Sequence, residues 1–361
     1  MSHAICRWAL LLAWSTVAAG SSSSSSIPGA TATCITADGI SRCYHTYVPS
    51  SASSNAPLVI DLHGYGSDVR YEAESSGWRE VADSDGVVVV WPEGSLIDGN
   101  PGWNAAPPGS DNKAGSVDDV ALLRTIIANT VAAQSIDNQR VYAVGWSNGC
   151  MMAQYFTLVE SNLVAGMACN SANLLYPPQS PPSGYTPVPI FTIHGTEDSG
   201  TTPFDLNNIA AWARYNSCTG SATTSSEAGQ GTRHTYSNCA TTSNGLSADV
   251  VLIELPGVGH ITLTAARTRL AWTFLGAFRG AGFDGLEVTS GESGGGSSST
   301  SPSAPGTGKD SDSKALDDGS IAGIVVGSVL GVCCLSGLLF FFCCCKGRNL
   351  NKPPPTFSDV R

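Results

Sequence analysis

Short apolar runs alternate with segments of helical spacing between residues 33 and 284. Most of these runs are continuous rather than interrupted at every second position. Continuous runs are typical of strands that are buried on both faces of a sheet. Strands are therefore expected at residues 44–48, 58–62, 87–91, 141–144, 164–169, 189–193 and 250–255.

Helices are expected between these runs, at residues 117–133, 150–159, 207–215 and 264–278. The first contains Asp119 three residues after Ser116, which is the spacing of a capping box. In the last, Leu270, Phe274 and Phe278 are four apart, as in a helix that packs on one side. Strands that alternate with helices indicate an α/β fold with a mainly parallel sheet and helices on both faces.

The start of the chain and the segment after the domain have different compositions. Residues 1–20 have the order of a secretory signal peptide, with Arg7 before a short apolar run and small residues at 17–20. An N-terminal membrane anchor is the alternative, but the apolar run is short for a span. Residues 287–319 are rich in Gly, Ser and Pro, and they cannot bury enough apolar surface to fold. We expect them to form a linker after a folded domain at residues 33–284.

A second hydrophobic segment, residues 320–343, is predicted to form one transmembrane helix. Acidic residues precede it and basic residues follow it, so a cytoplasmic tail of residues 344–361 and an extracellular domain are expected. A GPI signal is the main alternative, although its apolar tail would normally end the chain. These features predict a type I cell-surface protein. They leave open whether the extracellular domain is released from the membrane by shedding. Gly323, Gly327 and Gly331 are four apart, which leaves a homodimer through the span open as well.

Charge and cysteine content narrow the classes of partner. The net charge of −11 argues against nucleic acid, because phosphates would not be neutralised. The chain has neither a CxxC nor an HExxH motif, so no metal site is expected. Six cysteines in a predicted extracellular domain imply three disulfides, with several connectivities open. Our working hypothesis pairs them in sequence order: Cys34 with Cys43, Cys150 with Cys169, and Cys218 with Cys239.

The most informative motif is Gly-Trp-Ser-Asn-Gly at residues 145–149, which follows a predicted strand and precedes a predicted helix. A serine on such a turn sits at a strained corner, where glycines on both sides avoid clashes with the neighbouring strand and helix. Ser147 is therefore the candidate nucleophile. The backbone N–H of Asn148 and the start of the helix would stabilise negative charge that develops beside it.

A serine nucleophile requires a base, and the base requires an orienting acid. Asp198 and His260 follow the last two predicted strands, where sites in open α/β sheets are built. Glu197 is an alternative acid. The order Ser147, Asp198, His260 is that of α/β-hydrolases. Each residue alone has a plausible structural role, but the three in this order favour a catalytic triad.

The remaining candidates lie in two loops. The second oxyanion donor is expected after the strand at 58–62, at the backbone N–H of Tyr65. His63 and His194 also end predicted strands, and we expect them to organise loops rather than to act as bases. Trp103 and Asn104 lie in a Gly/Pro-rich loop and are candidate substrate-binding residues, with an ordinary structural loop as the alternative.

From residue 42 to about residue 278, the chain resembles the secreted polyhydroxybutyrate depolymerase and feruloyl esterase family of α/β-hydrolases. The shared motifs lie at residues 57–64, 82–93, 103–104, 117–120, 145–149, 194–198 and 259–260. The resemblance implies an α/β-hydrolase fold and an extracellular serine esterase without cofactor, with Ser147, Asp198 and His260 as its triad. It also supports the pair Cys218 and Cys239. Members often have Trp-Pro after the histidine, whereas residues 261–263 are Ile-Thr-Leu, so the resemblance does not define the substrate pocket.

The features together predict a surface-anchored carboxylic ester hydrolase. The resemblance implies a hydroxycinnamate ester of the plant cell wall, an acetylated xylan or a hydroxyalkanoate polyester as the substrate. The feruloyl type is favoured, because no separate polymer-binding module is visible. A peptidase on the same fold and a catalytically silent adhesion or receptor domain are the alternatives. The complete set of triad residues argues against the silent domain.

Overall fold

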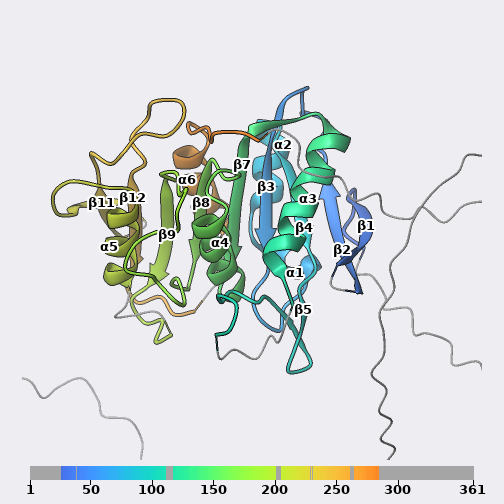
Figure 1. Ribbon diagram of the computed structural model, residues 1–361, viewed down its shortest axis with the longest axis horizontal. Coiled ribbons are helices and arrows are strands. Elements are labelled where there is room, and N and C mark those ends of the chain that lie inside the picture. The colour runs from blue at the N-terminus through green and yellow to red at the C-terminus, as the bar shows by residue number, and fades with distance from the viewer. Residues whose placement is uncertain are drawn as a thin grey trace, which may run out of the picture. The chain divides into compact units, whose positions relative to one another are not determined.

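The computed structural model describes residues 26–283, apart from residues 38, 111–116, 201–204, 228, 230 and 261–263. Within this part of the chain, ten strands form one sheet (Figure 1). They are β1 (Thr31–Ala37), β2 (Ile40–Tyr47), β3 (Ala56–Leu62), β4 (Val88–Pro92), β7 (Ile136–Trp146), β8 (Gly166–Asn170), β9 (Ile190–Gly195), β10 (Thr223–Glu227), β11 (Gly231–Tyr236) and β12 (Val250–Leu255).

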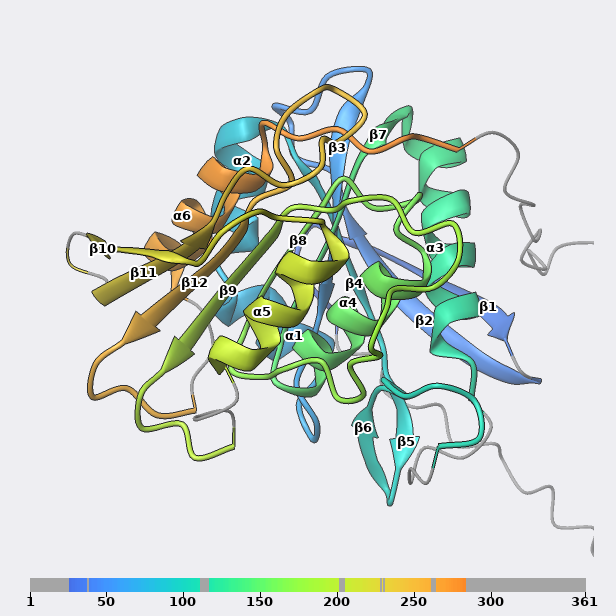
Figure 2. The same cartoon turned by 60° about the vertical axis from the view of Figure 1, so that its left-hand side comes forward.

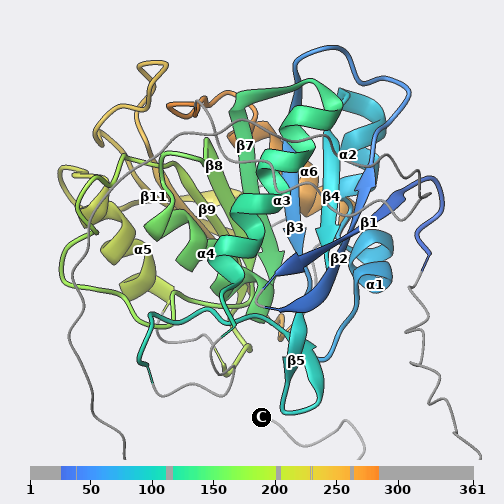
Figure 3. The same ribbon diagram turned by 45° about the vertical axis from the view of Figure 1, so that its right-hand side comes forward.

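The order of strands across the sheet is β1-β2-β4-β3-β7-β8-β9-β12-β11-β10. The central strands from β4 to β12 pair in parallel, and the two strands at each edge pair antiparallel. A separate hairpin of β5 (Ser95–Ile97) and β6 (Asn100–Gly102) follows β4. This hairpin projects from the end of the sheet at which the parallel strands terminate (Figure 3).

Helices cover both faces of the sheet (Figures 1 and 2). One face carries α1 (Val69–Ser75), α2 (Trp78–Asp85) and α6 (Ala265–Leu275), and the other carries α3 (Asp119–Gln134), α4 (Asn148–Val159) and α5 (Asp205–Tyr215). Each face has its own apolar core, one around Trp78 and Leu275 and one around Phe156 and Trp212. All residues of β3, β4, β8 and β9 are buried, because these strands lie between the two cores.

The predicted α/β architecture is confirmed, and all seven expected strands and four expected helices are present. The strand at residues 250–255 has the predicted bounds, and the other elements have shifted ends. The edge strands β1, β10 and β11 escaped prediction, since their sequences are polar or only half-buried and contain no continuous apolar run. The helices α1 and α2 also escaped prediction, because each spans about two turns and has too few positions to establish a period.

The predicted capping box at Ser116 and Asp119 is wrong. Asp118 caps α3 and accepts a hydrogen bond from the backbone N–H of Ala121 at 2.9 Å. Asp119 instead turns into the protein, where it pairs with Arg42 at 2.7 Å. Two adjacent aspartates therefore divide the tasks of capping and buried ion pairing, which their spacing alone does not separate.

Three disulfides join the cysteines in the expected sequence order. Cys34–Cys43 links β1 to β2, and Cys150–Cys169 links the first turn of α4 to β8. Cys218–Cys239 joins the segment after α5 to the segment after β11. Disulfides of this number are typical of proteins that fold in an oxidising compartment.

The predicted signal peptide, linker, transmembrane helix and cytoplasmic tail lie outside the described residues, as do the glycines proposed for dimerisation. Among the helices that the structure describes, none has both the length and the apolar character that crossing a bilayer requires.

A pair of buried carboxyl groups lies on the face covered by α1, α2 and α6. Asp61 of β3 and Glu72 of α1 are 1% and 2% exposed. Asp61 Oδ2 accepts hydrogen bonds from Ser76 Oγ at 2.7 Å and from Trp91 Nε1 at 2.9 Å. Burial raises the pKa of Asp61 to about 7, and burial together with the adjacent Asp61 raises the pKa of Glu72 well above its ordinary value. The folded pair therefore retains protons that the unfolded chain releases.

We expect this pair to make the fold less stable as the pH rises. The pair's contribution to the free energy of unfolding is fully present below the ordinary carboxyl pKa. This contribution is lost as the pH rises through the raised pKa of Asp61 at about 7. Thermal unfolding at about pH 4 and about pH 8 tests this expectation. The double variant Asp61→Asn/Glu72→Gln, which cannot titrate, should lose less stability between the two pH values than the wild type, by on the order of 2–4 kcal/mol.

Glu80→Gln is the matched control, because Glu80 is exposed on α2. It should keep the pH dependence of the wild type. Equal pH dependence in the wild type and the double variant would contradict the account.

Candidate active site

Ser147 stands at the corner between β7 and α4. Its backbone has φ 52° and ψ −119°, a conformation that L-residues rarely adopt and that stores strain. The backbone N–H of Ser147 donates to the carbonyl of Asn170, at the end of β8, at 3.0 Å. This corner is therefore held to the neighbouring strand while its side chain is turned out of the sheet.

The glycines on both sides of Ser147 are required by close backbone contacts, as the motif predicts. A Cβ at Gly149 would lie 1.9 Å from the carbonyl oxygen of Leu62, at the end of β3. A Cβ at Gly145 would lie 2.6 Å from the carbonyl carbon of Gly149. Any larger residue would push α4 away from the sheet, and the position of Ser147 would change with it.

The structure brings His260 and Asp198 to Ser147. His260 Nε2 lies 2.8 Å from Ser147 Oγ, and His260 Nδ1 lies 2.8 Å from Asp198 Oδ2. The carboxylate is 2% exposed, whereas the imidazole is 44% exposed. The second oxygen of Asp198 accepts from the backbone N–H of Gly200 at 3.1 Å. A buried carboxylate is thus aligned behind a solvent-accessible imidazole.

The loops that carry Asp198 and His260 are fastened to each other at Gly195. A Cβ at Gly195 would lie only 2.0 Å from the carbonyl oxygen of Val258. The backbone N–H of Glu197 donates to the same oxygen at 2.9 Å. Glu197 therefore supports the His260 loop through its backbone, and Asp198 is the carboxylate that contacts the imidazole.

Trp146 is a neighbour of the site whose role the sequence did not reveal. Its ring lies 5.7 Å from the His260 ring and 6.2 Å from the Tyr71 ring, measured between centroids. A Cβ at Gly64 would lie 2.6 Å from the Trp146 ring. Trp146 therefore packs between the loop after β3 and the imidazole. Its position directly before Ser147 could have indicated a contact with the site, because a side chain beside the nucleophile has to face a neighbouring loop.

A cavity of about 300 Å³ opens at Ser147, and we name it the serine cavity. All four remaining site candidates line it: Tyr65, Trp103, Asn104 and Asn148. Its described lining contains no charged side chain. Its apolar part includes Ile97, Met151 and Leu175, none of which stood out in the sequence.

The Asn148 side chain fixes the loop that forms one wall of the serine cavity. Its Oδ1 accepts from the backbone N–H of Trp103 at 2.6 Å, and its Nδ2 donates to the carbonyl of Trp103 at 3.2 Å. The Trp103 indole in turn donates to the carbonyl of His63 at 2.9 Å. Asn104 is fixed as well, because its backbone N–H donates to Asp119 at 2.7 Å. Trp103 and Asn104 thus combine a structural role with a position in the cavity.

Tyr65 and Asn148 are the two residues predicted to stabilise an oxyanion through their backbone N–H groups. Asn148 is the first residue of α4, where backbone N–H groups have no partner within the helix. Tyr65 donates from its hydroxyl to the carbonyl of Ile97 at 3.0 Å, which ties the loop after β3 to the β5–β6 hairpin. Their roles as oxyanion donors stay predictions.

His63 and His194 make their hydrogen bonds to groups other than Ser147. His63 Nδ1 donates to the carbonyl of Gly64 at 2.8 Å, and its Nε2 accepts from the backbone N–H of Gly94 at 3.0 Å. Burial lowers the pKa of His63, which keeps the ring neutral in this arrangement. His194 Nδ1 lies 2.6 Å from Asp205 Oδ1. Both buried rings fasten loops, as expected from the sequence.

The fold is that of the α/β-hydrolase class. A model of the phospholipase/carboxylesterase family matches residues 44–235, and the chain belongs to this family. The matched range includes Ser147 and Asp198 and ends before His260.

Several curated proteins are similar to the chain. A bifunctional acetylxylan esterase/xylanase of Neocallimastix patriciarum is 28% identical over 277 residues, which cover 75% of this chain and 38% of that protein. Feruloyl esterase B of Piromyces equi is 27% identical over 186 residues, covering 46% of this chain and 33% of the relative. A poly(3-hydroxyalkanoate) depolymerase of Paucimonas lemoignei is 31% identical over 123 residues, covering 34% and 29%. The chain thus spans less than half the length of these relatives.

Among solved structures, the acetyl xylan esterase from Aspergillus awamori superposes with a TM-score of 0.53 at 16% identity. The superposition covers 68% of this chain and 99% of that enzyme. At this identity the likeness supports the fold. The kinship with esterases expected from the sequence motifs is confirmed by the family match and by the named relatives.

Replacing Gly195 with alanine should displace the His260 loop, because the added methyl group would meet Val258 O at 2.0 Å. We expect Gly195→Ala to destabilise the protein by about 1–3 kcal/mol in chemical unfolding, as overpacked sites do. Gly259→Ala in the same loop is the matched control, since its Cβ meets nothing closer than 4.0 Å. Its stability should stay within about 0.5 kcal/mol of the wild type. Equal destabilisation of both variants would contradict this reading of the loop contact.

Proposed function

We propose that the protein is a serine carboxylesterase in which Ser147 is the nucleophile, His260 the base and Asp198 the orienting acid. The observation that supports this most directly is the continuous line from Ser147 Oγ through both ring nitrogens of His260 to Asp198, with 2.8 Å at each contact. The strained φ of 52° at Ser147 adds support, because backbone strain of this kind gathers at functional sites.

In this mechanism, His260 with its proton on Nδ1 donates to Asp198 and accepts from the hydroxyl of Ser147. As Oγ attacks the ester carbonyl, Nε2 takes the serine proton, and the buried carboxylate stabilises the imidazolium. The backbone N–H groups of Tyr65 and Asn148 receive the carbonyl oxygen as it becomes negative. The imidazolium then protonates the leaving alcohol, and water attacks the acyl-enzyme with His260 again as the base.

The serine cavity favours a bulky neutral acyl group. Its volume of about 300 Å³ is much larger than an acetyl group needs, and the Tyr65 ring and the side chains of Ile97 and Met151 are among its walls. We therefore propose a hydroxycinnamate ester of a plant cell-wall polysaccharide, of the feruloyl type, as the substrate. A hydroxyalkanoate polyester is the second candidate, supported by the similarity to the depolymerase of Paucimonas lemoignei.

Turnover of methyl ferulate by purified protein tests this function. Ser147→Ala should lower kcat by roughly 10⁴-fold or more, because the nucleophile is lost. Asp198→Asn should lower it by about 10³–10⁴-fold, since the imidazole loses its orienting carboxylate. Ser226→Ala, on the exposed edge strand β10, serves as the control and should match the wild type.

Turnover of an ester and of the matching peptide amide separates the esterase from a peptidase and from a silent adhesion or receptor domain. Faster turnover of a peptide amide than of the matching ester would assign a peptidase. A folded wild-type protein that turns over no ester would indicate a silent adhesion or receptor domain.

We also propose that the catalytic domain lies outside the cell and is held at its surface by the predicted helix at residues 320–343. The three disulfides support an oxidising compartment. The full chain, expressed in cells with a secretory pathway, should stay in the membrane pellet after alkaline carbonate washing. Its recovery in the wash would contradict the proposed anchor.

A further inference from the structure

A second cavity of about 300 Å³ lies beside the serine cavity. Its walls include Met151, Leu174, Leu175, Pro177, Asn207 and Asn208, and we name it the α5 cavity after the helix that carries the two asparagines. Met151 and Leu175 line both cavities, so the two are adjacent and share a wall. The proposed catalytic steps assign no role to the α5 cavity.

The α5 cavity lies on the side of Ser147 from which the base approaches. Ser147 follows β7, and the next strands across the sheet are β8, β9 and β12. The α5 cavity is lined by Gly200, in the loop after β9, and His260 comes from the loop after β12. The serine cavity instead takes Tyr65 from the loop after β3 and Ile97 from β5, which follows β4; β3 and β4 lie on the opposite side of β7.

This placement assigns one cavity to each half of an ester. The leaving oxygen has to receive its proton from His260, so the alcohol half departs on the side of the base. The acyl half then occupies the serine cavity, and the alcohol half is directed toward the α5 cavity.

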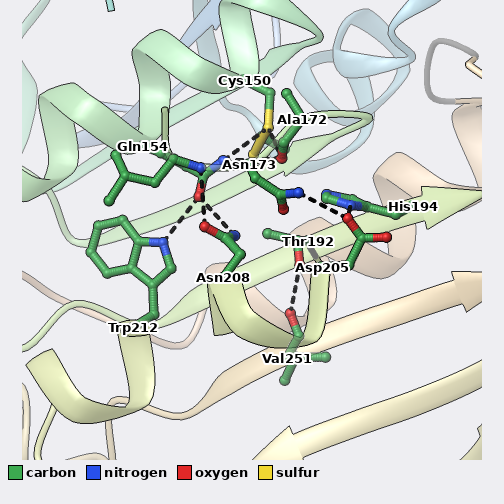
Figure 4. The surroundings of a disulfide bond; sticks show 12 residues. Cys150, Gln154, Ala172, Asn173, Thr192, His194, Asp205, Asn208, Trp212 and Val251 are labelled. Carbon is green, nitrogen blue, oxygen red and sulfur yellow. Dashed lines mark hydrogen bonds and ion pairs between the residues drawn. A yellow bond between two sulfur atoms is a disulfide. The ribbon is translucent and has the colours of Figure 1, made fainter. Parts of the chain in front are cut away.

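The buried side chain of Gln154 lies at the centre of a hydrogen-bonded cluster that includes Asn208, a residue of the α5 cavity lining (Figure 4). Gln154 of α4 accepts hydrogen bonds from Asn208 Nδ2 at 2.9 Å and from Trp212 Nε1 at 3.0 Å, both on α5. It also donates to the carbonyl of Ala172 at 3.1 Å. Asn208 Oδ1 accepts from the backbone N–H of Leu174 at 3.0 Å. Helices α4 and α5 and the segment after β8 are thereby fixed to one another through groups that are fully buried or nearly so.

The chemistry of the α5 cavity fits a neutral ring that carries hydroxyl groups. Leu174, Leu175 and Pro177 supply apolar surface, and no charged side chain belongs to the described lining. The exposed Asn207 supplies an amide for which no described residue is a hydrogen-bond partner. An amide both donates and accepts, which matches a hydroxyl group, whereas the ester carbonyls of a polyester only accept.

We propose that the α5 cavity is the alcohol-side subsite and that it binds a neutral sugar ring of the ester substrate, with Asn207 as a specificity-determining contact. This inference rests on the proposed esterase function and adds the leaving-group specificity of the same site. Exposed apolar side chains also adjoin the lining residues along the chain: Tyr176 and Leu206 are 42% and 48% exposed. They offer further surface to a sugar chain longer than one unit.

Two ferulate esters that differ only in their alcohol test the proposal: methyl ferulate and ferulate linked to a neutral arabinose-containing xylo-oligosaccharide. The full chain should show a higher kcat/KM for the sugar ester than for the methyl ester. Asn207→Leu keeps the size of the side chain and removes its hydrogen bonds. It should lower kcat/KM for the sugar ester about tenfold, mainly through KM, and leave methyl ferulate within about twofold. Arg214→Ala, exposed at the other end of α5, is the control and should change neither value.

Each other result would overturn a defined part of the account. Equal kcat/KM values of Asn207→Leu and wild type on the sugar ester, with methyl ferulate still hydrolysed, would reject the subsite and leave the esterase function intact. If Asn207→Leu lost turnover of a hydroxybutyrate trimer but kept turnover of the sugar ester, the α5 cavity would bind a polyester unit and not a sugar ring. Absence of turnover of every ester by the wild type would reject the esterase function and the subsite with it.

Discussion

Close backbone contact at the carboxyl ends of the parallel strands is the constraint on which the site depends. At Gly149 the start of α4 lies against the end of β3, so that a methyl group there would reach 1.9 Å from Leu62 O. At Gly195 the end of β9 meets the His260 loop equally closely, because a Cβ added there would lie 2.0 Å from Val258 O. These two contacts place the corner that carries Ser147 and the loop that carries His260 at one end of the sheet.

Buried polar groups complete what the glycines begin. Gln154 joins α4 to α5, Asn148 joins the start of α4 to the Trp103 loop, and Arg42 joins β2 to Asp119. Each lies between elements that an apolar core alone would allow to slide, because hydrogen bonds are directional and apolar contacts are not. The walls of the serine cavity and the α5 cavity are therefore set by polar contacts inside the protein as well as by packing.

The sequence predicts the framework of the site well and its walls poorly. Ser147, Asp198 and His260 could be found because each follows a strand with a continuous apolar run, and because their order along the chain is distinctive. Gly145 and Gly149 could be explained from the turn that they flank. These features are local in sequence, and the structure brings the three side chains within hydrogen-bonding distance of one another.

The remaining parts depend on contacts between segments that are distant in sequence. Met151 and Leu175 become a shared wall only because the segment after β8 folds back beside α4. Asn207 is an ordinary exposed helix residue until α5 is placed against β12. The edge strands β10 and β11 are polar because their side chains are exposed or half-buried, and no periodic pattern distinguishes them from loops.

The most direct test of the account is to find which residue a fluorophosphonate probe modifies in the folded protein, by intact-mass measurement and peptide mapping. The account predicts one added probe per chain, attached to the hydroxyl of Ser147, because the hydrogen-bonded His260 activates that hydroxyl. Modification at a different residue, or no modification of a folded and disulfide-bonded protein, would contradict it.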